Sequence, residues 1–100
     1  MQIVWSPRAQ RRLREYAQNL AEYDYPQTAV AWLNKVRSDT ALLADHPRAG
    51  RESPEFIGKR PTVHDIAIGN YRLFYRIKRE YVEIISIHNC RQKITSLRSL

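Results

Sequence analysis

The first half of the chain carries apolar residues at helical spacing. Ser6-Pro7 is suited to begin a helix, with Ser6 as the N-cap and Pro7 in the first helical position. Asp24-Tyr25-Pro26 interrupts the pattern and starts a second helix, which His46-Pro47 ends. Because the interruption is short, the two helices are predicted to form an antiparallel hairpin. Their apolar stripes consist of Ala9, Leu13, Tyr16, Ala17, Leu20 and Ala21 in the first, and Ala29, Trp32, Leu33, Val36, Thr40 and Leu43 in the second.

Strand-like segments open the chain and fill its second half. Residues 2–5, 62–68, 71–77 and 81–88 are rich in aromatic and β-branched residues. Gly69-Asn70 is a two-residue hairpin signal, and Lys78 to Glu80 forms a second turn. Residues 47–61 hold three prolines and two glycines and are predicted to be a long loop. Residues 89–100 form a basic tail, with Ile94 and Leu97 spaced for a short helical turn.

This order of elements, β-α-α-β-β-β, predicts an α+β fold in a single domain over residues 1–100. The two-helix hairpin is expected to pack on one face of a mostly antiparallel four-stranded sheet. In the strand YRLFYRI, residues 71–77, the side chains of Tyr71, Leu73, Tyr75 and Ile77 should point toward the helices. The other face would then be open to water. The three side chains predicted to lie on this open face are Arg72, Phe74 and Arg76.

The charge of the chain narrows the choice of partner. The 17 Lys and Arg residues exceed the 10 Asp and Glu residues and give a net charge of +7. Most of the excess lies in residues 51–100, with ten basic and five acidic residues, against seven and five in residues 1–50. Such an excess indicates an anionic partner, which could be nucleic acid, an acidic protein or a membrane surface. A basic protein without such a partner is the alternative.

The remaining composition excludes several classes of protein. Cys90 is the single cysteine, so neither a disulfide framework nor a Cys/His zinc site is expected within one chain. No stretch has the apolar length of a signal peptide or a membrane span. These features favour a cytoplasmic protein without a metal or another cofactor and without a membrane partner.

Four sequence blocks together resemble the RelE/ParE superfamily of toxins from bacterial type II toxin–antitoxin systems. They are the frame W-S-P-x-A-x-x-x-L at 5–13, HPRAGR at 46–51, YRLFYRI at 71–77 and VEIISIHNCRQ at 82–92. The resemblance implies a growth-inhibiting toxin that a cognate acidic antitoxin neutralises in an oligomeric complex. It implies two possible targets, because RelE-like members cleave mRNA on the ribosome whereas ParE-like members inhibit DNA gyrase.

The RelE-like alternative requires acid–base groups and cations that hold a phosphate, and it requires no metal. By resemblance Arg72 and Arg91 would hold the phosphate, and His88 is the nearby group that titrates near neutrality. The tail departs from this alternative, because residues 92–100 contain neither the tyrosine nor the histidine that several mRNA-cleaving members use.

For this reason the sequence favours the ParE-like alternative, in which His88 has a structural role. A non-toxic nucleic-acid-binding module remains a third possibility, although the chain has no helix-turn-helix or zinc pattern. In every case a set of basic side chains is expected to contact the target or its nucleic acid. The predicted contacts are Arg48, Arg51, Lys59, Arg60, Arg76 and Lys93.

Overall fold

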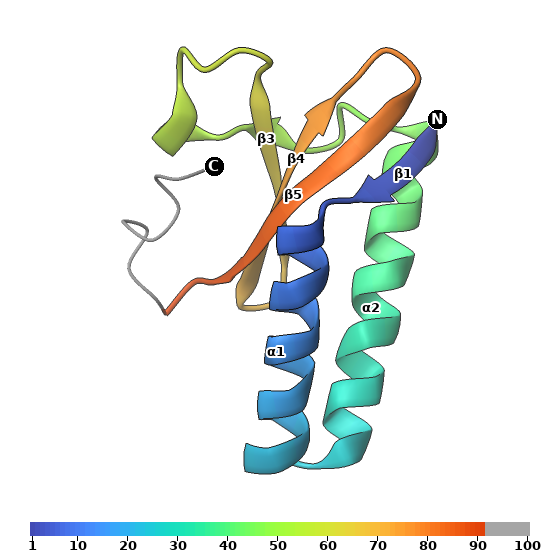
Figure 1. The fold of residues 1–100 in the computed structure, drawn as a ribbon, viewed down its shortest axis with the longest axis vertical. Helices are drawn as coiled ribbons and strands as arrows, with labels where there is room; N and C mark the ends of the chain where they lie inside the picture. Colours follow the sequence, from blue (N-terminus) through green and yellow to red (C-terminus); the bar gives the residue numbers. More distant parts are fainter. Residues whose placement is uncertain (92–100) are drawn as a thin grey trace.

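The computed structural model describes residues 1–91 and has the predicted order of elements, with one additional short strand (Figure 1). The helices are α1 (Pro7–Tyr23) and α2 (Pro26–Asp45), with a 3-10 turn, η1 (Pro54–Phe56), inside the predicted loop. The strands are β1 (Gln2–Trp5), β2 (Arg51–Glu52), β3 (Val63–Ile68), β4 (Tyr71–Ile77) and β5 (Tyr81–Asn89). The predicted turn around Ile94 and Leu97 lies outside the described residues.

The five strands form one sheet in the order β1-β5-β4-β3-β2. All neighbouring strands are antiparallel except β1 and β5, which run parallel. The two-residue loop at Gly69-Asn70 places Ile68 opposite Tyr71, as expected for a tight hairpin. The prediction of four strands was wrong by one, because β2 has only two residues and lies within the proline- and glycine-rich loop.

The helix hairpin begins and ends where the sequence predicted. The Ser6 side chain accepts a hydrogen bond from the backbone N–H of Ala9 at 3.1 Å, and Pro7 occupies the start of α1. The short break at Asp24-Tyr25 sends α2 back alongside α1 (Figure 1). Ser6 also donates a hydrogen bond from its hydroxyl to the Ile85 carbonyl at 3.2 Å, and this contact fixes the start of α1 against the sheet.

The main core lies between the helix hairpin and one face of the sheet. The fully buried side chains there include Val36, Leu73, Tyr75, Ile84 and Ile87. At its edge, Tyr16 of α1, Trp32 of α2 and Tyr71 of β4 form an aromatic cluster with ring centroids 4.8 to 6.3 Å apart. This cluster joins both helices to the sheet, as the predicted apolar stripes require.

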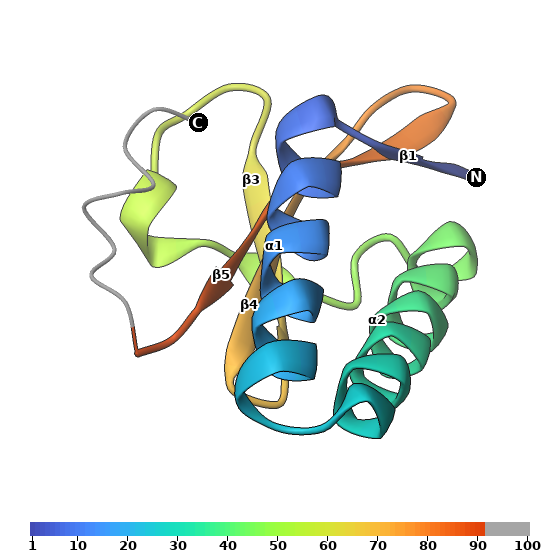
Figure 2. The ribbon, with the colours of Figure 1, turned by 60° about the horizontal axis from the view of Figure 1, so that its bottom comes forward.

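The second face of the sheet is not open to water, and this prediction was wrong. Phe74 is fully buried and packs edge-to-face on Phe56 of η1, with ring centroids 5.8 Å apart. Val63 and Ile85 complete a second, smaller apolar cluster on this face. Figure 2 shows the sheet between the helices on one side and the η1 segment on the other. The loop folds back over the sheet because Phe56 would otherwise expose a large apolar side chain.

A hydroxyl group secures the beginning of this loop. The Tyr75 hydroxyl donates a hydrogen bond to the Pro47 carbonyl at 2.8 Å and accepts one from the Gly50 N–H at 2.9 Å. Burial raises the pKa of Tyr75, so the phenol remains a donor over a wider pH range. The backbone of Gly50 lies so close to β3 and β4 that this position has no room for a side chain. The backbone of the HPRAGR block therefore binds the Tyr75 hydroxyl and fixes the start of the loop to β4.

Candidate functional site

Arg72 of β4 lies in a network of carboxylates on the second face of the sheet. Its guanidinium donates to both oxygens of Glu55, at 2.7 and 2.8 Å, and also to Oδ2 of Asp65 at 2.6 Å. Its side chain is 13% exposed, and the guanidinium carbon lies 4.9 Å from the centre of the Phe74 ring. Arg72 was predicted to lie on an open surface. Instead, it is held by two carboxylates and an aromatic ring, and its hydrogen bonds to Glu55 and Asp65 raise its pKa.

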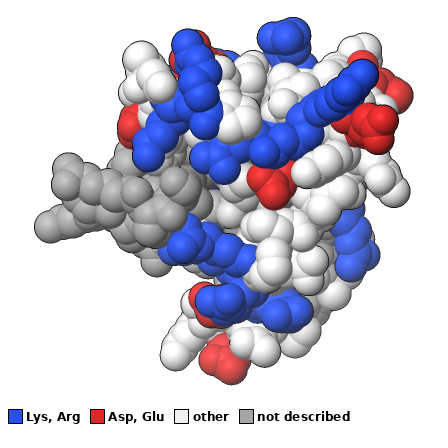
Figure 3. Space-filling view, turned by 45° about the horizontal axis from the view of Figure 1, so that its top comes forward, with Lys and Arg blue, Asp and Glu red and all other residues white. Residues whose placement is uncertain are grey.

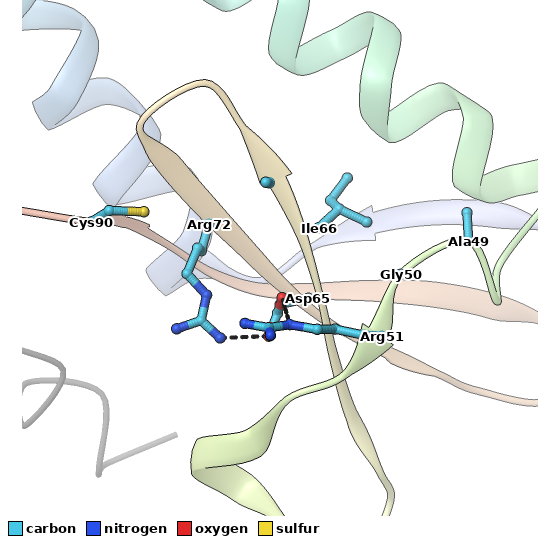
Figure 4. Close-up of a pocket in the computed structure, with 8 residues that line it drawn as sticks. Ala49, Gly50, Arg51, Asp65, Ile66, Arg72 and Cys90 are labelled. Atoms are coloured by element: carbon cyan, nitrogen blue, oxygen red, sulfur yellow. Dashed lines mark hydrogen bonds and ion pairs between the residues drawn. The ribbon is translucent and has the colours of Figure 1, made fainter.

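Asp65 connects this network to a second arginine. Its Oδ1 accepts a hydrogen bond from Nε of Arg51 at 3.0 Å, and its side chain is only 4% exposed. Figure 4 shows the side chains of Arg51 and Arg72 converging on Asp65 from opposite sides. Both arginines border an open depression of about 580 Å³, which Cys90 also lines. A buried carboxylate between two guanidinium groups has its charge compensated, so the network is electrostatically satisfied.

Glu55 is the residue through which pH should affect this network. Its hydrogen bonds from Arg72 lower the pKa of Glu55 from 4.5 to about 2. A further hydrogen bond from the Ser53 hydroxyl, at 2.9 Å, acts in the same direction. A carboxylate with a lowered pKa in the folded state stabilises the fold above its unfolded pKa. This stabilisation should be complete above pH of about 4.5 and should be lost as the pH falls toward about 2.

We therefore expect Glu55→Gln to make the free energy of unfolding less dependent on pH under acidic conditions. The free energy of unfolding of the wild-type chain should fall between pH of about 4.5 and about 2 more steeply than that of the variant. Urea denaturation across this pH range measures both profiles. Glu52→Gln on β2 is the matched control, since no ion pair among the described residues involves Glu52. Equal slopes in all three proteins would contradict the role assigned to Glu55.

The structure places His88 beside Arg72, but inside the protein. The two residues are directly opposite each other in the pairing of β4 with β5. His88 is 2% exposed. The structure therefore brings these two candidate residues side by side on adjacent strands, but it leaves His88 almost completely buried.

The other predicted contact residues do not form a single site. Arg91 follows β5 in an exposed turn, where its backbone N–H donates to Oδ1 of Asn89 at 2.9 Å. Arg76 is half-buried on β4, opposite Val63 on one side and Glu83 on the other. Lys93 lies outside the described residues. The remaining three are exposed: Arg48 in the turn after α2, and Lys59 and Arg60 in the loop before β3.

Two carboxylates at the centre of the network were not predicted as site residues. The position of Asp65 could have been deduced, because the tight hairpin at residues 69–70 sets Ala67 opposite Arg72 and makes Asp65 its diagonal neighbour on the same face. The position of Glu55 could not have been deduced from the sequence, because it depends on how the loop crosses the sheet. Among residues 1–91, no group of three or more His, Cys, Asp or Glu side chains could hold a metal ion. No helix in the same range is long and apolar enough to cross a membrane.

Comparisons with known proteins identify the family. The family model described as the ParE toxin of type II toxin-antitoxin system, parDE, matches residues 3–94. A solved structure, titled the chromosomal ParDE TA system from P. aeruginosa, is 18% identical in sequence. The match covers 89% of this chain and 95% of that chain, with a TM-score of 0.74, and it supports the same fold. No curated protein matches the chain. Because the family model spans nearly the whole sequence, the chain belongs to the ParE toxin family of type II toxin–antitoxin systems.

Proposed function

We propose that this toxin inhibits DNA gyrase by binding and does not cleave RNA. The observation that carries the choice is that Arg72 is held by Glu55 and Asp65. A phosphate would have to displace one or both of these carboxylates before it could bind Arg72. The charge of a guanidinium that already has carboxylate partners is less available to stabilise a phosphorane in a transition state. Membership of the ParE family supports the same choice.

The alternative, ribosome-dependent mRNA cleavage, would depend on His88 and Arg72 acting together. Their position on adjacent strands is compatible with such a pair. However, a general base must come within hydrogen-bonding distance of the 2′-hydroxyl, and His88 is 2% exposed. Residues 92–100 also supply no tyrosine or histidine that could replace it. The alternative would therefore require β5 or its surroundings to move.

The toxin–antitoxin family implies an antitoxin partner for this chain. The net charge of +7 favours an acidic antitoxin whose association is fast and sensitive to salt. An antitoxin segment that folds on binding could cover a large area of the toxin with few residues. We propose that both proteins act in the cytoplasm, where gyrase and DNA are found.

Two assays on the purified chain distinguish the targets. In the first, gyrase, ATP and relaxed plasmid are mixed with increasing toxin, and we expect supercoiling to be inhibited. In the second, the toxin is incubated with ribosomes carrying a defined mRNA, and we expect the mRNA to remain intact.

Alanine variants of the three candidate catalytic residues complete the design. Cleavage in the ribosomal A site that is abolished by His88→Ala or Arg72→Ala would overturn the proposal. If the gyrase mechanism is correct, Arg91→Ala can weaken inhibition by removing an exposed cation. His88→Ala should act only through the stability of the fold.

A further inference from the structure

The first two turns of α1 carry a group of arginines that the proposed function does not use. Arg11 and Arg12 follow Arg8 by three and four residues, so all three lie on one side of the helix. Together with Glu15 they line a surface depression of about 340 Å³. Figure 3 shows basic side chains in several groups over one face of the molecule, with fewer acidic side chains among them.

This arginine cluster, Arg8, Arg11 and Arg12, is unfavourable for the helix that carries it. The first turn of α1 contains no acidic residue, although the positive end of the helix dipole favours one there. Like charges three and four residues apart also repel each other. Among the described residues, none of the three arginines takes part in an ion pair, and neither does the neighbouring Glu15. Local arrangements that oppose stability are expected at functional surfaces.

The chemistry of the cluster distinguishes between possible partners. Guanidinium groups bind phosphate oxygens through two parallel hydrogen bonds. A protein interface normally needs buried apolar or aromatic anchors, and single-stranded nucleic acid needs exposed rings for base stacking. Neither is present here, because the large exposed apolar residues of the described chain all lie outside residues 7–15. They are Met1, Val4, Tyr23, Tyr25, Val30, Leu42 and Ile57.

We propose that the arginine cluster of α1 binds the phosphate backbone of duplex DNA without reading its base sequence. Three guanidinium groups on one side of a helix match a row of phosphates, and release of counterions supplies the affinity. The absence of large exposed apolar side chains at residues 7–15 also argues against insertion into a membrane surface. This proposal does not depend on gyrase being the target, because it concerns direct contact between the toxin and DNA.

The test compares two double variants of the full chain that remove the same charge. Arg11→Gln/Arg12→Gln removes two members of the cluster, whereas Lys35→Gln/Arg37→Gln removes two cations from α2. Fluorescence anisotropy with a short labelled duplex of arbitrary sequence gives the affinity at several salt concentrations. We expect the α1 variant to bind the duplex on the order of tenfold more weakly at low salt. The slope of log K against log salt concentration should also be smaller in magnitude by about 2 for this variant. The α2 variant should lose less than about threefold.

Several results would overturn the proposal. Equal losses of DNA affinity in the two variants would mean that the net charge of the chain, and not the arginine cluster, determines binding. A loss of affinity for poly-glutamate without a loss for DNA would assign the cluster to an acidic protein. A loss of affinity for anionic vesicles alone would assign it to a lipid surface. Thermal unfolding of both variants serves as the control for folding, because all four replaced side chains lie on the helix surfaces and both variants should melt close to the wild-type chain.

Discussion

Gly50→Ala should be among the most damaging single-methyl substitutions in this chain. A Cβ atom at residue 50 would lie 2.5 Å from the Asp65 carbonyl oxygen, 2.5 Å from the Tyr75 hydroxyl and 2.9 Å from Cγ2 of Ile66. Because all three neighbours belong to the paired strands β3 and β4, they cannot move aside independently. We expect a loss of about 3 kcal/mol or more in the free energy of unfolding, at the upper end of the cost of overpacking.

Gly69→Ala provides the matched control for this prediction. Gly69 has a φ of 59° in the β3–β4 hairpin, and a Cβ atom there would meet no other atom within 4 Å. Its cost should therefore be limited to the left-handed backbone conformation, about 1–2 kcal/mol. Urea denaturation of both variants measures the difference. A Gly50 variant as stable as the Gly69 variant would show that the contact between the loop and Tyr75 is looser than described.

Arg72→Met should be the second large effect. The substitution keeps an apolar stem next to Phe74 but leaves Glu55 without its guanidinium partner and Asp65 with Arg51 alone. Asp65 is 4% exposed, so water cannot replace the lost contact easily. Removing one member of a buried ion pair costs about 3–5 kcal/mol, and we expect a loss near the lower end because Arg51 remains.

Arg51→Met is the informative comparison, since Arg51 also binds Asp65 but has a side chain that is 61% exposed. Loss of an exposed ion pair should cost less than about 1 kcal/mol. The two variants remove the same charge from the same network, so their difference reports the deeper burial of Arg72 together with its additional partner Glu55. Equal losses would indicate that Arg72 is more accessible than its contacts suggest, and this would weaken the argument against a catalytic role.

The regular elements could be predicted because their signals are local. Ser6-Pro7, Asp24-Tyr25-Pro26 and Gly69-Asn70 each determine an element boundary through backbone chemistry that involves only neighbouring residues. The alternation of residues 71–77 also assigned Tyr71, Leu73 and Tyr75 correctly to the helix side. The prediction that the second face of the sheet is open to water failed. The alternation of side chains along a strand shows to which face each one points, but it does not show which other segment covers that face.

The loop of residues 47–61 covers the second face of the sheet. Its prolines and glycines predicted an irregular segment, whereas the structure folds it into β2 and η1 and places Phe56 on Phe74. The same fold brings Glu55 to Arg72. Contacts between residues 17 positions apart depend on the path of the loop, which the sequence pattern does not specify. The resemblance to a toxin family was correct, while the environment of its candidate catalytic residues could be described only in three dimensions.

The dependence of inhibition on stoichiometry tests the central claim, that this toxin binds gyrase and does not act as an enzyme on RNA. Purified toxin is titrated against a fixed amount of gyrase in the supercoiling reaction and against a fixed amount of mRNA-loaded ribosomes in the cleavage reaction. A binding inhibitor should give inhibition that saturates as the toxin becomes equimolar with gyrase, and the mRNA should remain uncut at every ratio. Turnover of mRNA by toxin present at far fewer copies than ribosomes, with supercoiling unaffected, would contradict the claim.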